Sequence, residues 1–181
     1  FFASHCLKVD GDYVECGVGK GIVSGSICKY IDIDKTNKTI WLYDTFEGIP
    51  KEHSSAATHE EREMHSLMND LHYGGSYLSA AKNKFSVFQN VKIIQGSVPE
   101  SLEANCPERV AFLHIDMNNS IAEEGALNVF WDKLLPGAVV LLDDYAYHKV
   151  FDNQKQAIDR FCRRKNYSVL TLPTGQGLII K

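Results

Sequence analysis

Short apolar runs alternate along this chain with amphipathic stretches, which is the pattern of repeated strand–helix units. Seven runs read as strands, and the run at 111–116 is apolar enough for a buried parallel strand. The predicted strands span 13–16, 39–44, 91–95, 111–116, 138–143, 167–172 and 177–181. The predicted helices span 22–31, 121–134 and 149–165, with a short helix opened by Pro99.

This order of elements predicts an α/β fold, a doubly wound and mostly parallel sheet covered by helices on both faces. Only four residues, 173–176, join the last two predicted strands, which is short enough for an antiparallel hairpin. Among doubly wound folds, that ending favours a methyltransferase over a dehydrogenase. A chain of 181 residues suffices for one domain, so we expect a single domain over 1–181. The chain opens without Met, so we expect the N-terminus to be incomplete.

Residues 51–84 interrupt the alternation, because they are polar and contain no predicted strand. Thr58 and Glu61 have the spacing of a capping box, which predicts a helix beginning near them. Its apolar face should carry Met64, Leu67, Met68 and Leu71. An insertion at the carboxyl end of a strand lies on the ligand side of such sheets. We interpret this segment as a lid over a binding site; the alternative is a surface or dimer helix without substrate contact.

A second capping box, from Ser120 to Glu123, places the start of the helix over 121–134. After that helix, Pro136 and Gly137 are expected to turn the chain into the strand at 138–143.

The composition narrows the function classes. Apolar residues make up 44% of the chain and charged residues 23%, as in an ordinary globular protein. A net charge of -4 without a long basic run argues against a nucleic-acid partner. No stretch of 18 apolar residues exists, so no membrane span is expected, and no signal peptide is visible. Five scattered cysteines without metal-ligand spacing predict reduced, mostly buried thiols and a cytoplasmic location.

The first chemical signal is a loop of alternating glycines, Gly17, Gly19 and Gly21, between the first strand and the first helix. Glycine lets backbone approach a ligand closely, and the helix N-terminus directs a positive dipole end toward it. Residue 22 is Ile, so the loop departs from the six-residue dinucleotide fingerprint. A tight strand–helix turn without a ligand is the alternative.

The second signal is a set of aspartates at strand ends. Asp44 closes the second strand, where a carboxylate can accept the ribose hydroxyls of a nucleoside; by itself it could equally be a helix cap. Asp116, Asp143 and Asp144 end two strands that should be neighbours, less than about 5 Å apart. Converging carboxylates repel one another unless a cation or proton lies among them, and Mg²⁺ or Ca²⁺ suits such ligands. Otherwise one aspartate caps a helix and another contacts the cofactor.

Histidines supply further candidates. His148 follows the acid pair and could act as a base, although a surface loop residue is an equal alternative. His114 alternates with apolar residues inside a predicted strand, which favours a hydrogen-bonded core residue. The histidines of the insertion lack tight metal spacing and are interpreted as solvated, or as substrate contacts from the lid. They are His53, His59, His65 and His72.

Three strings of this sequence resemble one family. They are VECG at 14–17, LYDTFEGIP at 42–50 and LLDDY at 141–145. Together they resemble the macrocin O-methyltransferase family of class I S-adenosylmethionine-dependent methyltransferases, over nearly the whole chain. The resemblance implies a Rossmann-like fold, S-adenosylmethionine as cofactor and Mg²⁺ as a metal.

The resemblance also implies residue roles. The methionine half of the cofactor would lie along Glu15, Gly17, Val18 and Gly19, and Lys20, where the family usually has Arg, could hold its carboxylate. Asp44 would take the ribose. Residues beside the adenine would be Thr45, Phe46, Gly96, Ser97 and Val98. Asp116, Asp143 and Asp144 would hold the metal, and Asp116 would also be the general base and lie near the cofactor.

One stretch departs from the family. The family commonly reads DGDLYES after the fourth strand, whereas this chain reads DMNNSIA at 116–122, so Asn118 replaces the second acid. The resemblance implies O-methylation of a hydroxyl on a sugar or glycosylated small molecule. The oligomeric state stays open, with a homodimer as one arrangement. The alternatives are an NAD-dependent Rossmann enzyme and a non-catalytic protein that binds S-adenosylmethionine.

Overall fold

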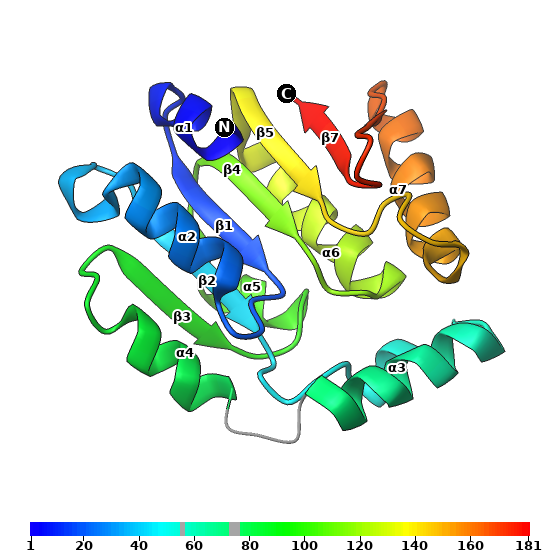
Figure 1. Cartoon of the computed structure of the whole chain (residues 1–181). Coiled ribbons are helices and arrows are strands. Elements are labelled where there is room, and N and C mark those ends of the chain that lie inside the picture. The colour runs from blue at the N-terminus through cyan, green and yellow to red at the C-terminus, as the bar shows by residue number, and fades with distance from the viewer. Residues whose placement is uncertain (55–56, 73–76) are drawn as a thin grey trace.

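The computed structural model describes residues 1–54, 57–72 and 77–181, and within them seven strands form one mixed sheet. The strands are β1 (Asp12–Cys16), β2 (Ile40–Asp44), β3 (Val91–Gln95), β4 (Val110–Ile115), β5 (Leu134–Leu142), β6 (Leu170–Thr171) and β7 (Gly177–Ile180). Their spatial order is β3-β2-β1-β4-β5-β7-β6. Strands β1 to β5 pair in parallel, and β7 is antiparallel to both β5 and β6. The predicted fold class is confirmed (Figure 1).

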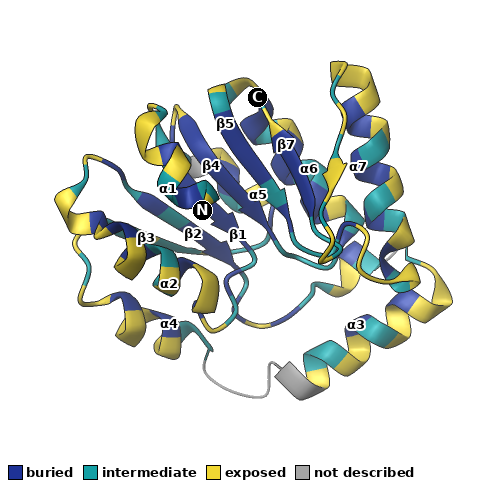
Figure 2. Cartoon of the chain, turned by 45° about the horizontal axis from the view of Figure 1, so that its top comes forward, coloured by how far each residue is buried: buried dark blue, intermediate teal, exposed yellow. Residues whose placement is uncertain are grey.

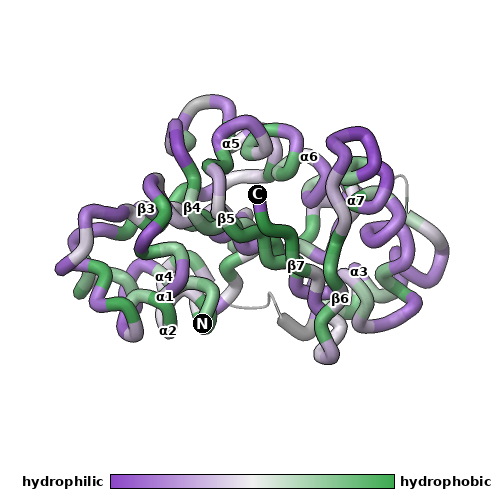
Figure 3. The backbone as a smooth tube through the Cα atoms, turned by 90° about the horizontal axis from the view of Figure 1, so that it is seen from above, coloured by the Kyte–Doolittle hydropathy of each residue, from purple (hydrophilic) through white to green (hydrophobic). Residues whose placement is uncertain are grey.

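Helices cover both faces of this sheet. Viewed from above, α1, α2 and α4 lie on one face and α5, α6 and α7 on the other (Figure 3). The α-helices are α1 (Phe2–His5), α2 (Ile22–Ile31), α3 (His59–His72), α4 (Tyr77–Phe85), α5 (Glu100–Ala104), α6 (Ser120–Phe130) and α7 (Asp152–Lys165). The 3-10 turns are η1 (Cys6–Lys8), η2 (Ile33–Lys35), η3 (Lys51–Ser54), η4 (Trp131–Lys133) and η5 (Lys149–Phe151). None of the helices in the described ranges combines the length and apolar character that crossing a bilayer requires.

Side chains of the central strands alternate between two hydrophobic cores, one on each face of the sheet. In β4, Leu113 and Ile115 pack with α6 and α7, whereas Phe112 packs with α2 and α4. Strand β5 divides in the same way, with Val140 on one side and Val139 on the other. Figure 2 shows β1, β4 and β5 buried along most of their length. The carboxyl ends of these three strands are therefore held firmly side by side.

Helix α6 begins one residue away from the predicted capping box, so that prediction is wrong. Asn119, rather than Ser120, is the N-cap, and its side-chain oxygen accepts hydrogen bonds from the backbone N–H groups two and three residues later, at 2.9 and 3.1 Å. Glu123 points into the protein instead of reaching back to the cap. Asn and Ser cap helices about equally well, so local preference does not decide between them.

The predicted start of β5 is also wrong. Helix α6 ends at Phe130 rather than 134, and β5 begins at Leu134 and runs through Pro136 and Gly137 instead of starting after them. The pairing of β4 with β5 shifts register at this point. A bulge accommodates proline within a strand, because the ladder there does not need its missing N–H. The closing strands β6 and β7 are shorter than predicted, and both residues of β6 are exposed at the sheet edge.

The predicted helix of the insertion is present as α3, and its capping box is confirmed. The Thr58 backbone N–H donates to the Glu61 carboxylate at 2.6 Å, and the Glu61 N–H donates to the Thr58 hydroxyl at 3.2 Å. The predicted apolar face is wrong at Leu67, which is 57% exposed, while Glu61 and His65 are buried. The helix lies beyond the carboxyl ends of the strands (Figure 1). Part of the predicted lid lies outside the described residues, namely 55–56, 73–76 and the side chains of Leu71 and His72.

Candidate functional site

The loop between β1 and α2 is built from glycine because its backbone requires it. Gly17, Gly19 and Gly21 have φ values of 90°, 51° and 65°, in the left-handed region that favours glycine. A Cβ on Gly17 would overlap the carbonyl oxygen of Asp116, so the loop and the end of β4 touch directly. Around Gly19 the space is open. The loop therefore presents bare backbone at the N-terminus of α2, an arrangement suited to an anionic or polar ligand.

Asp44, at the end of β2, fastens this loop to the sheet. One carboxylate oxygen accepts the N–H groups of Val18 at 2.7 Å and Gly19 at 2.8 Å. The other accepts the N–H of Phe46 at 2.6 Å. A carboxylate has about four acceptor positions, so Asp44 keeps little free capacity in this state. Its predicted contact with a ribose stays a prediction.

Beneath the loop lies a buried ionisable pair. Glu15 accepts a hydrogen bond from the hydroxyl of Ser24 and lies 2.9 Å from the Nδ1 atom of His114. Burial alone would lower the pKa of His114, but the bond to Glu15 and the surrounding carboxylates raise it. The prediction that His114 is a hydrogen-bonded core residue is confirmed. The pair fixes the position of Glu15, which lines the cleft described below.

Three carboxylates meet where β4 and β5 end. Asp116 follows β4 and Asp143 and Asp144 follow β5, and one oxygen from each lies within 4.8 Å of the others. The side-chain amide of Asn118 donates to Asp116 over 3.5 Å, and that of Gln176 donates to Asp143 over 2.6 Å. The predicted convergence of the three aspartates is thus present in the structure.

The electrostatics of this cluster match a cation site. Burial, followed by the charge of Asp143, raises the pKa of Asp116 to about 7. The same two causes raise the pKa of Asp144 to about 6. A divalent cation among the three carboxylates would compensate both the burial and the mutual repulsion, and oxygen donors are those that Mg²⁺ prefers. The residues present therefore fit such an ion.

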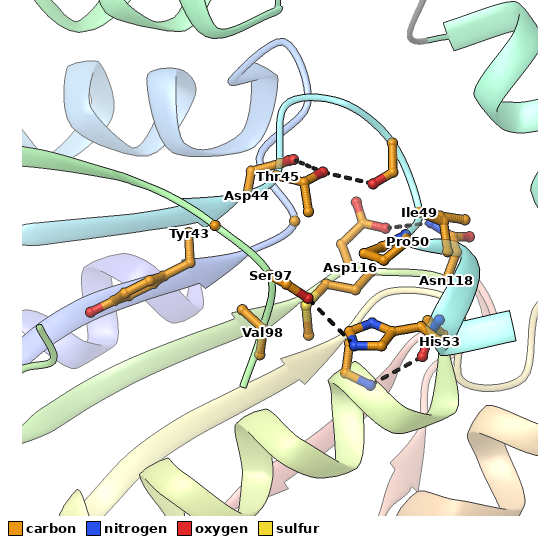
Figure 4. Close-up of a pocket in the computed structure, with 16 residues that line it drawn as sticks. Tyr43, Asp44, Thr45, Ile49, Pro50, His53, Ser97, Val98, Asp116 and Asn118 are labelled. Atoms are coloured by element: carbon orange, nitrogen blue, oxygen red, sulfur yellow. Dashed lines mark hydrogen bonds between the residues drawn. The ribbon is translucent and has the colours of Figure 1, made fainter. Parts of the chain in front are cut away.

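Two cavities adjoin at the glycine loop. The larger is an open cleft of about 690 Å³ between the loop, α3 and η5. The smaller, of about 50 Å³, lies beyond the ends of β2 and β3 (Figure 4). Gly17, Asp116 and Asn118 line both. An elongated ligand could therefore extend from the cleft past the end of β4 into the small pocket.

The cofactor residues expected from the resemblance divide between these cavities. In the cleft lie Glu15, Gly17, Val18, Gly19 and Lys20. In the small pocket lie Asp44, Thr45, Gly96, Ser97 and Val98. Phe46 differs from the others, because its side chain is buried in the core with α2 and α4 and does not line the small pocket.

Two of the predicted site residues are exposed to solvent. Lys20 is exposed, and its ammonium lies 5.5 Å from the centre of the Tyr77 ring. His148 is exposed and caps η5, where its Nδ1 accepts the N–H of Val150 at 3.2 Å. Unlike its neighbour Tyr147, His148 is not among the residues that line the cleft. The structure therefore brings Asp116, and not His148, to the centre of the site.

The interpretation of the insertion histidines as solvated is wrong for two of them. His65 is buried, with its ring nitrogens 2.8 Å from the Ser54 hydroxyl and 2.8 Å from the backbone oxygen of Asn118. It thereby connects α3 to the loop after β4. His53 is also buried and lines the small pocket, whereas His59 is exposed. The spacing of Glu61 and His65, one helical turn apart, is the signal that could have placed them on one face.

A parallel sheet closed by an antiparallel hairpin, with a glycine loop after β1 and an acid ending β2, defines the class I methyltransferase fold. The solved structure of the O-methyltransferase NovP shares it, with a TM-score of 0.80 over 99% of this chain and 77% of that one. The sequence identity of that pair is 20%, so the likeness concerns the fold.

The family model described as macrocin-O-methyltransferase matches residues 5–171. The chain therefore belongs to the macrocin-O-methyltransferase family, as its sequence strings indicated.

Two curated relatives are similar to this chain. The mycinamicin III 3''-O-methyltransferase of Micromonospora griseorubida is 27% identical over 159 residues, 78% of this chain and 60% of the relative. The second, from Streptomyces olivaceus, is the 4'-O-methyltransferase of 8-demethyl-8-(2,3-dimethoxy-alpha-L-rhamnosyl)-tetracenomycin-C, 27% identical over 141 residues, 76% of this chain and 54% of the relative. The chain thus spans somewhat more than half the length of each.

Proposed function

We propose that this chain binds S-adenosylmethionine and transfers its methyl group to a hydroxyl of a sugar or glycosylated small molecule. The observation that carries the proposal is the position of Asp116, Asp143 and Asp144. The three carboxylates converge beside the glycine loop, and two of them, Asp116 and Asp144, line a cleft of about 690 Å³. A cofactor site and an acceptor site would therefore share one edge of the sheet, as methyl transfer requires.

The cofactor would lie across both cavities. Its methionine half would follow the glycine loop, with the carboxylate near Lys20 at the cleft margin. Asp44 would receive the ribose in place of the Thr45 hydroxyl, which now donates to its carboxylate over 3.5 Å. The base would enter the small pocket beside Thr45, Ser97 and Val98. The overlap of the two cavities at Gly17 and Asp116 supports a single ligand in this orientation.

In the proposed reaction the bound cofactor would supply an electrophilic methyl group, and Mg²⁺ would lower the pKa of the acceptor hydroxyl. Asp116, Asp143 and Asp144 would hold that ion. Asp116 is also the group we propose to receive the hydroxyl proton, because it lines the cleft at the end of β4, beside the glycine loop. His148 is the less favoured base, since its Nδ1 already accepts the N–H of Val150.

The class of acceptor follows from the relatives and from the cleft. One relative is named for a rhamnosyl-bearing tetracenomycin, and the other for mycinamicin III. In this chain, the cleft is lined by Tyr77, Tyr147 and Phe151, together with Met68 of α3. Flat aromatic faces suit the apolar faces of sugar rings and of polyketide ring systems. We propose that α3 acts as the lid over this acceptor.

The proposal extends to the binding partners, the cellular location and the oligomeric state of the enzyme. We propose a small-molecule acceptor rather than nucleic acid or a membrane, because the net charge is -4. We propose a cytoplasmic location, since all five cysteines are free and four of them are buried. A homodimer is also proposed, and light scattering of the purified protein would test it.

The test is a methyl-transfer screen with labelled S-adenosylmethionine over nucleotide-linked sugars and glycosides, with Mg²⁺ and with EDTA. We expect a methylated product with at least one glycoside and its loss in EDTA. The Asp143→Asn variant should lose at least about tenfold in rate, whereas Asp132→Asn, at an exposed position in η4, should not. Binding of S-adenosylhomocysteine without product from any acceptor would support a non-catalytic binding protein, and absence of binding would overturn the proposal.

A further inference from the structure

Three buried side-chain atoms in the described part of the chain have no hydrogen-bond partner: Nδ1 of His53, Nδ2 of Asn119 and Oγ of Ser101. Leaving a buried polar group unpaired is costly, so such atoms are rare and call for an explanation. Two of the three, those of His53 and Asn119, belong to residues that line the small pocket. Ser101 is not among the lining residues. Two of the three residues with an unpaired atom therefore border one cavity.

The side-chain amide of Asn119 can offer this pocket only a donor. Its oxygen is occupied as the N-cap of α6, where it accepts the N–H groups of Ile121 and Ala122. That bonding fixes which end of the amide is nitrogen, and the NH₂ group is left over. The residue is 3% exposed, so water does not readily satisfy it.

His53 can offer the pocket an acceptor. It lies on η3 and is 8% exposed, and its Nε2 lies 3.4 Å from the hydroxyl of Ser97. Figure 4 marks this contact with a dashed line. A neutral imidazole carries one donor and one acceptor nitrogen. When Nε2–H donates to Ser97, Nδ1 is the acceptor, and it is the atom without a partner.

A donor and an acceptor at one pocket match the edge of adenine, where the 6-amino group donates beside ring nitrogens that accept. Hypoxanthine, with a 6-oxo group, lacks that donor. We propose that Asn119 and His53 select the base of the cofactor, with the Asn119 amide donating to a ring nitrogen and Nδ1 of His53 accepting from the 6-amino group. The inference rests on the proposed function, because it assumes that the cofactor's base enters this pocket.

The burial of the two unpaired atoms adds a condition. Nδ1 of His53 and Nδ2 of Asn119 are both enclosed in this structure, so the pocket must open further for a base to reach them. His53 is carried by the four-residue turn η3, whereas Asn119 is held by the cap of α6. We expect η3 to move outward when the base enters, and His53 to close on the amino group.

Calorimetry with S-adenosylhomocysteine and S-inosylhomocysteine tests the inference on the purified chain. We expect the wild type to prefer the adenosyl compound by about tenfold or more, because His53, in the tautomer that carries its proton on Nε2, finds no donor at the 6-oxo group of hypoxanthine. The His53→Phe variant should bind the adenosyl compound about tenfold more weakly and lose most of that preference. In Asn119→Asp the cap oxygen is retained but an acceptor replaces the donor, so adenosyl binding should fall by about tenfold or more.

The Ser101→Ala variant is the matched control, since it removes the third unpaired atom, which lies outside the pocket. It should leave both affinities unchanged, and thermal melts should show that all variants fold. If the wild type does not bind S-adenosylhomocysteine, the proposed function itself fails. If the wild type binds it and both pocket variants keep its affinity and its preference over S-inosylhomocysteine, only the present inference is overturned.

Discussion

Glu123 is a fully enclosed carboxyl group in α6, and replacing it with Gln should stabilise the protein increasingly as pH rises. Its Oε1 accepts the backbone N–H of Met117 at 3.3 Å and the side-chain amide of Gln154 at 2.8 Å. Burial, followed by the charge of Asp116, raises the pKa of Glu123 from 4.5 to about 8. Gln can keep both accepted bonds and carries no charge, so it isolates the effect of ionisation.

The sign follows from the direction of the shift. A folded-state pKa above the unfolded value means that the native state holds this proton more tightly. The stability contributed by Glu123 is therefore complete below about pH 4.5 and is lost as pH rises through about 8. Each intervening pH unit changes the folding equilibrium by at most about tenfold. Over the whole interval this amounts to about three orders of magnitude, a few kcal/mol out of a typical 5–15.

Urea unfolding of wild type and Glu123→Gln, in EDTA between pH 5 and 9, measures this difference. The advantage of the variant should grow with pH up to about 8 and then level off. Glu124→Gln is the control, because the neighbouring carboxylate lies near the surface and pairs with Arg164 at 2.7 Å. Its effect should stay within about 1 kcal/mol. A constant difference for Glu123→Gln across this range would refute the assignment of Glu123 as a buried, protonated carboxyl.

Two further predictions concern the glycine loop and the thiols. Gly17→Ala should prevent stable folding or strongly lower the melting temperature, because a Cβ at this position would overlap the Asp116 carbonyl. Gly19 has open space around it, so Gly19→Ala should cost only about 1–2 kcal/mol of backbone strain. Similar melting temperatures for the two variants would contradict this reasoning. Ellman's reagent should react quickly with the partly exposed Cys106 and with the other four cysteines only after unfolding. More than one fast thiol would show that the native packing differs.

Local patterns in the sequence were sufficient for most of the fold. The apolar runs at β1, β2, β3 and β4 were located within about one residue, because a buried strand needs a continuous apolar stretch whatever lies around it. The capping box of α3 was also found, since its two hydrogen bonds link residues only three apart. The carboxylate cluster was predicted because parallel strands end at one edge.

Features that depend on contacts between distant segments were missed. Asn119 rather than Ser120 caps α6, although both residues cap well, because the loop after β4 delivers the chain in one particular orientation. His53 and His65 looked solvated in a polar segment, yet contacts with Ser97 and with the Asn118 carbonyl bury them. The residues of the first contact are 44 positions apart in sequence and those of the second are 53 apart, and no spacing rule predicts hydrogen bonds over such separations.

The sequence by itself thus determined the class of fold, the glycine loop and the identities of the acids at the strand ends, because each follows from short-range chemistry and strand order. Tertiary structure alone decided how much of the carboxylate of Asp44 is already used by Val18 and Gly19. It also decided which polar atoms are left without partners in the small pocket. Burial and pairing are properties of the packed chain, since they depend on what every neighbouring segment places beside a given atom.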